Sequence, residues 1–125
     1  MSDALTQFAN AKYLSLETFR KSGAGVRTPV WFAQIPGRAI FYVYSEAGAG
    51  KVKRVRNNPK VRVAPCTFRG KVTGEWVEAR ARFCDAEEYA RGQQLLRRKY
   101  WLKMIGDFFG RLLGHENAVL AIELS

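Results

Sequence analysis

Cysteine and histidine are scarce in this chain of 125 residues. The two cysteines are Cys66 and Cys84, and the single histidine is His115. Because a structural zinc site takes about four such ligands, the sequence predicts no metal centre. Two thiols in a chain without a secretory signal are typical of the reducing cytoplasm, and we expect both to be buried or unreactive.

Long apolar runs are absent as well. No stretch approaches the ~20 apolar residues of a transmembrane helix, so we expect no membrane span. Residues 1–10 lack a basic segment followed by an apolar core, so we expect no secretory signal there and a cytoplasmic location. The composition, with 47% hydrophobic and 26% charged residues, predicts one folded domain over residues 1–125.

Acidic residues are outnumbered by basic ones. The 21 Lys and Arg residues against 11 Asp and Glu residues give a net charge of +10. Such an excess predicts an anionic partner, which could be nucleic acid, a membrane surface or a small molecule rich in phosphate or carboxylate groups. The charge by itself does not choose among them.

The hydrophobic pattern predicts a mainly β fold. Six segments bounded by turn signals alternate or are continuously apolar, which predicts strands at residues 13–21, 27–35, 38–44, 60–68, 75–84 and 117–124. The strand at 38–44 has no polar face, so we expect it to be covered on both sides. Successive strands joined by short turns predict an antiparallel sheet that closes into a small barrel.

Local signals mark four helices, at residues 3–10, 51–57, 85–103 and 106–114. The second of these ends before Pro59, because the residue before a proline disfavours the helical region. The long third helix begins with Asp85 as N-cap and Glu88 in a capping-box arrangement. Its basic run Arg97-Arg98-Lys99 is expected to be a solvated face.

A glycine-rich loop precedes the short basic helix. Gly48, Ala49, Gly50 and Lys51 stand where a strand is followed by a helix, so that backbone N–H groups and the positive helix end can converge on an anion. This predicts a phosphate site, with a solvated basic helix as the alternative. The loop matches neither the P-loop nor the dinucleotide-binding pattern. No Ser/His/Asp or Cys/His constellation is visible, so an enzyme of this sequence would take its chemistry from a cofactor.

Five sequence blocks carry a family resemblance. They are FRKSG at 19–23, VRTPVWF at 26–32, GKVKRVRNNP at 50–59, VRVAPC at 61–66 and RG at 69–70. Together they resemble the split-barrel superfamily typified by pyridoxamine 5'-phosphate oxidase, and within it the branch of deazaflavin (coenzyme F420)-dependent enzymes. The likeness runs from about Thr18 to Arg82, and the last third of the chain matches only in layout.

The resemblance implies a six-stranded antiparallel split β-barrel with a long helix before the last strand. It also implies a homodimer with cofactor sites at the interface, and an oxidoreductase that transfers hydride between reduced coenzyme F420 and a small organic substrate. FMN is the alternative cofactor, and heme binders or proteins without a cofactor occur among relatives of this fold. The net charge of +10 favours F420, whose phosphodiester and glutamate tail carry more negative charge than the one phosphate of FMN.

The resemblance further assigns cofactor-binding residues. The strand that begins at Arg27 is expected to lie along the cofactor ring. Lys51 matches the family's phosphate-binding lysine, whereas Gly50 stands where the oxidase has an arginine, a contact that we infer Lys53 or Arg54 to replace. The full expected set is Arg27, Thr28, Pro29, Val30, Trp31, Tyr44, Ser45, Gly50, Lys51, Lys53 and Arg54.

Other roles are less sharply indicated. No catalytic residue is assigned; Tyr42, Tyr44 and Cys66 are candidate proton donors only by their place on strands near the presumed site, and each is expected to be structural. Trp31, Phe32 and Trp101 are expected at the dimer seam.

A non-catalytic protein that binds a cofactor or nucleic acid is the competing function class. Basic residues cluster at 51–56 and again at 97–103. A continuous basic stripe with interleaved aromatics would favour single-stranded nucleic acid, whereas convergence on the loop after Tyr44 would favour a cofactor. We expect a small-molecule substrate and no nucleic acid.

Overall fold

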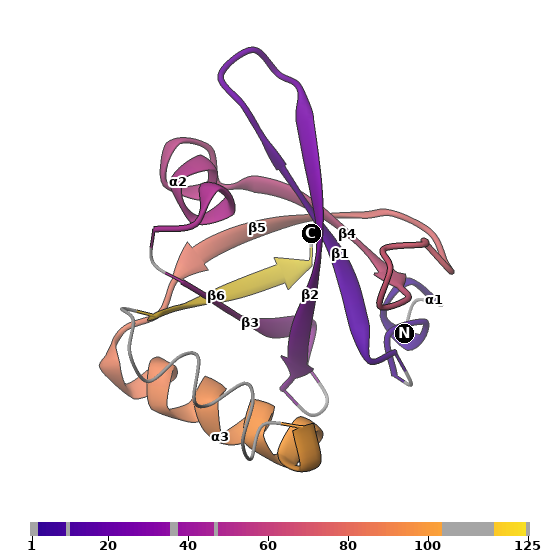
Figure 1. The fold of residues 1–125 in the computed structure, drawn as a ribbon, viewed down its shortest axis with the longest axis vertical. Helices are drawn as coiled ribbons and strands as arrows, with labels where there is room; N and C mark the ends of the chain where they lie inside the picture. The colour runs from indigo at the N-terminus through magenta and orange to yellow at the C-terminus, as the bar shows by residue number, and fades with distance from the viewer. Residues whose placement is uncertain (1–2, 10, 36–37, 47, 104–116, 125) are drawn as a thin grey trace.

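Six antiparallel strands close into a barrel in the computed structural model, which describes residues 3–9, 11–35, 38–46, 48–103 and 117–124. The spatial order is β1-β2-β3-β6-β5-β4, so the last strand lies between the third and the fifth (Figure 1). The strands are β1 (Tyr13–Phe19), β2 (Gly25–Gln34), β3 (Ile40–Glu46), β4 (Lys60–Cys66), β5 (Val77–Phe83) and β6 (Asn117–Leu124). The predicted mainly β barrel is confirmed.

The described residues also form α1 (Asp3–Thr6), α2 (Gly50–Asn57) and α3 (Ala86–Lys103). The first is shorter than the predicted helix at 3–10, and the predicted helix at 106–114 lies outside the described residues. α2 packs at one end of the barrel core, whereas α3 packs on the outer face of the sheet, apart from α2 (Figure 1). In the described part of the chain, no helix has the length and apolar character needed to cross a membrane.

The hairpin between β1 and β2 is tighter than the sequence indicated. The Arg20 N–H donates to the Ala24 carbonyl at 2.9 Å, and the Gly23 N–H donates to the Arg20 carbonyl at 2.8 Å. Gly23 has a φ of 93°, which side-chain-bearing residues rarely adopt. β1 therefore ends at Phe19 and β2 already begins at Gly25, and the hairpin projects beyond the barrel (Figure 1).

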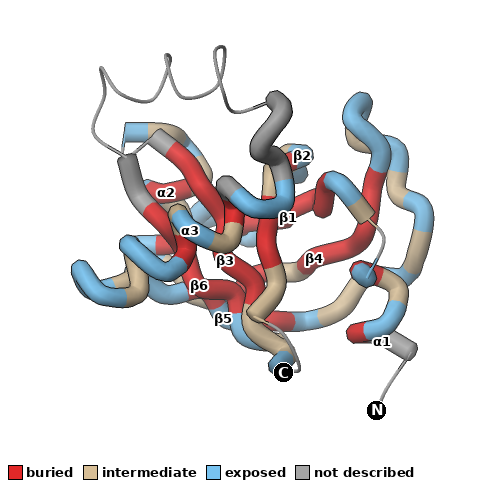
Figure 2. The backbone as a smooth tube through the Cα atoms, turned by 90° about the horizontal axis from the view of Figure 1, so that it is seen from below, coloured by how far each residue is buried: buried red, intermediate tan, exposed pale blue. Residues whose placement is uncertain are grey.

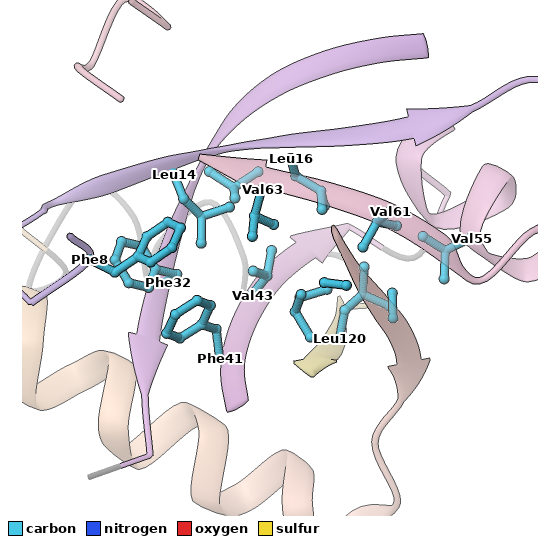
Figure 3. Close-up of a cluster of buried hydrophobic side chains, with 14 of the residues drawn as sticks. Phe8, Leu14, Leu16, Phe32, Phe41, Val43, Val55, Val61, Val63 and Leu120 are labelled. Atoms are coloured by element: carbon cyan, nitrogen blue, oxygen red, sulfur yellow. The ribbon is translucent and has the colours of Figure 1, made fainter. Parts of the chain in front are cut away.

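Alternating inward residues of all six strands fill the barrel. Figure 3 shows Phe8, which follows α1, packed with Phe32 and Phe41 at one end of this core. The Phe8 and Phe41 ring centroids are 4.9 Å apart, and those of Phe32 and Phe41 are 5.3 Å apart. Val55 of α2 reaches the same core from the other end. Each such buried side chain contributes roughly 1.5–3 kcal/mol.

β3 is covered on both sides, as its lack of a polar face predicted. Phe41 and Val43 point into the barrel, whereas Tyr42 and Tyr44 belong to a second cluster with Leu96 of α3. All of these side chains are buried, and Figure 2 shows that burial continues from β3 into the neighbouring β6. The long helix therefore lies over the outer face of the central strands.

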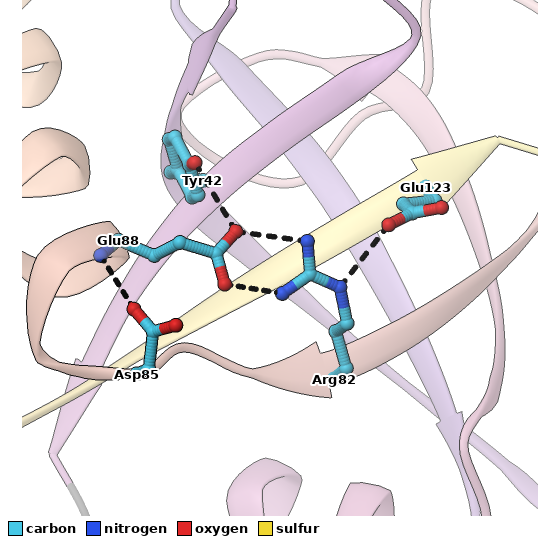
Figure 4. Close-up of polar contacts among 5 residues, drawn as sticks. All are labelled: Tyr42, Arg82, Asp85, Glu88 and Glu123. Carbon is cyan, nitrogen blue, oxygen red and sulfur yellow. Dashed lines mark hydrogen bonds and ion pairs between the residues drawn. The ribbon is translucent and has the colours of Figure 1, made fainter.

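The start of α3 is held by a group of charged residues (Figure 4). The Glu88 N–H donates to Asp85 Oδ1 at 2.8 Å, which confirms Asp85 as the N-cap. The Glu88 carboxylate departs from the predicted capping box: it accepts hydrogen bonds from Arg82 Nη2 at 2.8 Å and from the Tyr42 hydroxyl at 3.5 Å. Arg82 Nε also donates to Glu123 at 3.1 Å. β3, β5, β6 and α3 are thus joined through one guanidinium and one carboxylate.

Glu88→Gln is expected to lower the free energy of unfolding at neutral pH by about 1 kcal/mol, because a partly exposed ion pair becomes a weaker neutral contact. Hydrogen bonds from Arg82 lower the pKa of Glu88 below its ordinary value of 4.5. The stabilisation is therefore present above that value and is lost as the pH falls through the lower folded-state pKa. Urea unfolding at neutral pH and in increasingly acidic buffers measures this difference.

Glu87→Gln is the matched control, since Glu87 is exposed on the same helical turn. Equal losses of stability in the two variants, or a difference that persists into strong acid, would contradict the role given to Glu88.

Candidate anion and cofactor site

The start of α2 is electropositive. Its N-cap is Ala49, whose side chain makes no capping hydrogen bond, and no acidic residue lies in the first turn. Lys51, Lys53 and Arg54 add three cations to the positive end of the helix dipole. The helix ends at Asn57, before extended Asn58 and Pro59, as predicted. An anion at the helix start would meet both backbone N–H groups and side-chain charges.

Arg54 folds back over the first residue of its own helix. Its Nε donates to Thr18 Oγ1 at 2.7 Å, and its Nη1 lies 2.9 Å from where a Cβ on Gly50 would stand. Thr18 is fully buried in β1. The missing side chain of Gly50 therefore makes room for the guanidinium of Arg54, which a buried hydroxyl holds in place. Sequence reasoning left Arg54 and Lys53 as equals; Lys53 is exposed, whereas the guanidinium of Arg54 reaches back from the last turn to Gly50 at the helix start.

The two predicted residues at the end of β3 face in opposite directions. Ser45 is buried on the barrel side, in line with Val43. The Tyr44 hydroxyl accepts a 2.6 Å hydrogen bond from Gln93 Nε2 of α3 and lies 3.4 Å from the Tyr89 hydroxyl. Ser45 therefore shares the inward face of β3 with Val43, and Tyr44 anchors α3.

The first part of β2 pairs on one side only. Gly25 to Trp31 pair with β1, whereas the pairing with β3 begins at Phe32. Among the described residues, no strand covers the second edge of this segment. Its backbone N–H and C=O groups can therefore bond a ligand or another chain. This open edge contains the five residues that were expected along the cofactor ring.

The side chains of this segment divide between two faces. Val30 is buried in the barrel, and Thr28 lies on the same face. Pro29 and Trp31 share the outer face with Arg27, in register with Ser15 and Tyr13 of β1. Because the side chains point to two faces, a ligand that spans the whole segment would contact all of its residues only through the backbone edge.

Arg27 belongs to a network that sequence reasoning missed. Its Nε donates to the buried Glu17 at 3.0 Å, and Arg62 Nη1 donates to the other Glu17 oxygen at 3.3 Å. The guanidinium carbons of Arg27 and Arg62 lie 4.6 Å and 5.2 Å from the Trp76 ring. Glu17 is the only acid of β1, and it is buried on the face opposite Leu14 and Leu16, where a carboxylate needs a cationic partner. The Trp76 ring packs against both guanidinium groups.

Two of the candidate proton donors, Tyr42 and Cys66, have raised pKa values, as has the second thiol, Cys84. Burial, with Glu88 nearby, raises the pKa of Tyr42, and burial raises the pKa of the Cys66 thiol. Burial also raises the pKa of Cys84 to about 11. All three groups therefore hold their protons at neutral pH and release them poorly. Within the described residues, no group of three His, Cys, Asp or Glu side chains could hold a metal ion.

Lys99 departs from the solvated face expected of the basic run on α3. The residue as a whole is exposed, but its Nζ lies 3.4 Å from the centroid of the Phe32 ring. The loss of water around this ammonium lowers the pKa of Lys99 to about 8. Arg98 is exposed and is the better control for general charge effects.

Comparisons by sequence identify no relative, since no family model and no curated protein matches the chain. Solved structures do match. A proposed pyridoxamine 5'-phosphate oxidase from Listeria innocua superposes with a TM-score of 0.69 at 14% identity, over 97% of this chain and 90% of that one. The chain has the split-barrel fold of the pyridoxamine 5'-phosphate oxidase-like proteins.

Proteins with different ligands share this split barrel. HutZ, the heme storage protein from Vibrio cholerae, matches with a TM-score of 0.70 at 15% identity, over 93% of this chain and 83% of its own. A protein named as an F420 reductase matches with a TM-score of 0.60 at 13% identity, over 100% of this chain and 95% of its own. The likeness establishes the fold, which oxidoreductases and heme-binding proteins both use.

Proposed function

We propose that this protein is an oxidoreductase that binds coenzyme F420 and serves hydride transfer with a small organic substrate. The observation that carries the proposal is the guanidinium of Arg54, held by Thr18 at the positive start of α2 beside Lys51. Arg54 supplies the cation that Gly50 lacks. In this scheme the phosphate-bearing tail contacts Lys51 and Arg54, with Lys53 at the solvent side.

The ring of the cofactor is proposed to lie along the open edge of β2. Thr18 links the two parts of the site, because it bonds Arg54 and is paired with Val26 of β2. The edge offers backbone hydrogen-bond donors and acceptors to the polar atoms of a ring system. When bound, the reduced deazaflavin supplies a hydride. The chain itself positions the ring and excludes water, and we assign no proton donor.

The charge around α2 supports F420 over FMN. Three cations lie in the first five residues of the helix, more than one phosphate monoester needs. Arg56 contributes less, since its guanidinium lies over the Phe83 ring at 5.2 Å, beside β5. The second basic cluster is on α3, which lies apart from α2, so the two clusters do not run together as a nucleic-acid stripe would (Figure 1).

Lys51→Ala and Arg54→Ala are each expected to weaken F420 binding by roughly ten- to a hundredfold, because each removes a charge-assisted hydrogen bond of about 1.5–3 kcal/mol. Thr18→Val is expected to cost less, since Arg54 keeps its charge and loses only its fixed position. Fluorescence titration of the purified protein with F420, FMN and FAD, together with an absorbance titration with heme, measures these affinities. The loss should shrink as salt rises.

Arg98→Ala is the matched control and should leave F420 affinity unchanged. Equal losses in Arg98→Ala and Arg54→Ala would mean that the chain attracts anions only through its overall charge. Tight heme binding with no response to F420 or FMN would replace the oxidoreductase proposal with heme binding.

We further propose a homodimer with the cofactor sites at its interface, so that a second copy closes over the ring bound along the open edge of β2. An unpaired edge is an association site, although Pro29 contributes no N–H to it. Half-buried Trp31 remains a proposed seam residue. Phe32 was wrongly expected there, because its ring lies inside the barrel and is 1% exposed. The Trp101 side chain lies outside the described residues.

Sedimentation equilibrium at micromolar protein is expected to give twice the mass of the chain, because the proposed interface places the open edge of β2 and the half-buried Trp31 against a second copy. A monomeric mass across that concentration range would contradict the proposed dimer without affecting the phosphate contacts.

A further inference from the structure

A rigid turn connects β4 to the segment before β5. In this turn, residues 67–71, the Thr67 N–H donates to the Lys71 carbonyl and the Gly70 N–H to the Thr67 carbonyl, both at 2.9 Å. The Lys71 N–H donates to Thr67 Oγ1 at 3.1 Å, and Cys66 and Val72 form a bridge just outside. Gly70 has a φ of 90°, which favours glycine. These bonds hold Phe68 and Arg69 at the tip.

Phe68 is the most exposed large apolar side chain in the described residues. It is 72% exposed, and its ring contacts that of Tyr13, with the two centroids 5.7 Å apart. Phe83, at 39%, is less exposed and lies under Arg56. Turn tips favour Gly, Pro, Asn and Asp because water surrounds them. An aromatic ring fixed in that position gains free energy only when something else covers it.

The turn 67–71 lies beside the open edge of β2. A Cβ on Gly70 would stand 3.9 Å from the ring of Pro29. Tyr13, which Phe68 contacts, is in register with Trp31. Phe68 therefore flanks the segment along which the cofactor ring is proposed to lie. A small molecule that reacts with that ring would be within reach of Phe68.

The only charged side chains of the turn 67–71 are positive. Residues 67–74 contain Arg69 and Lys71, both exposed, and no acidic residue. Arg27, on the outer face two residues before Pro29, keeps 55% of its side chain exposed. An apolar body with a negative group matches a lone aromatic ring between cations. A membrane or a nucleic acid would need a broader face than one ring supplies.

We propose that the turn 67–71 forms one wall of the substrate site and binds organic anions with a flat apolar body. Phe68 packs against that body, and Arg69 pairs with its carboxylate. This inference rests on the proposed oxidoreductase function and names its substrate class. It does not depend on the phosphate contacts proposed for Lys51 and Arg54.

The test uses 2-naphthoate as a flat aromatic carboxylate and 2-naphthalenemethanol as its neutral counterpart, with calorimetric titration of the full chain with and without F420. The parent protein should bind the carboxylate at least fivefold more tightly than the alcohol. Phe68→Ala and Arg69→Gln should each weaken 2-naphthoate binding at least fivefold, and Arg69→Gln should leave the alcohol unaffected. Phe83→Ala and Arg80→Gln, at exposed positions of β5, are the matched controls and should bind like the parent.

The outcomes separate this inference from the proposed function. Loss of F420 binding in Lys51→Ala with no effect of Phe68→Ala on 2-naphthoate would overturn the substrate wall alone. Absence of F420 binding, with 2-naphthoate still dependent on Phe68 and Arg69, would overturn the cofactor and keep an organic-anion site. A monomeric Phe68→Ala variant in sedimentation would assign Phe68 to a second copy of the chain, and vesicle or oligonucleotide binding that depends on Phe68 would assign it to those partners; either result overturns the substrate wall.

Discussion

The insertion of β6 between β3 and β5 closes the barrel, and the rest of the structure depends on it. Val119 to Ile122 are buried, and their neighbours on both sides come from strands far earlier in the chain. Without β6, the inward Phe41 and Val43 would face water, and α3 would lose part of the sheet surface on which it packs. The barrel therefore forms only when the last strand is in place, since its interior is one continuous apolar core.

The two longer helices on the barrel have different roles. On the outer face of the sheet, α3 is fixed by polar groups that reach it from β3 and β5, with Tyr42 and Arg82 meeting Glu88. At one end of the core, α2 packs Val52 and Val55 inward and leaves its positive start exposed to ligands. A buried hydroxyl acts in each place, because it fixes a long side chain at small entropic cost.

The open edge of β2 follows from the length of its neighbours. β3 pairs with the last part of β2, and the hairpin with β1 continues beyond that point. The unpaired segment thus lies next to both Arg54, through Thr18, and the turn 67–71, through Pro29. The phosphate contact at Thr18, the backbone edge of β2 and the turn that follows β4 are all connected through β1 by strand pairing. This shared position is why we connect the cofactor and the substrate proposals.

Local patterns in the sequence were enough to determine the elements. Alternation located six strands, Asp85 marked the start of α3, and Pro59 marked the end of α2. The glycine and lysine of the loop before α2 indicated an anion site, because helix starts and flexible backbone act over a few residues. An antiparallel barrel was also expected, since short turns favour antiparallel neighbours, but the place of β6 between β3 and β5 was not.

Only the tertiary structure decided which side chains meet. Arg54 reaches Thr18 across 36 positions of sequence, and Arg62 reaches Glu17 across 45. The choice of Arg54 over Lys53, and the commitment of Tyr44 to α3, depend on the curvature of the sheet and on the space left by Gly50. Periodicity assigns a residue to a face of its own strand or helix, but contacts between elements depend on how the closed barrel stacks those faces.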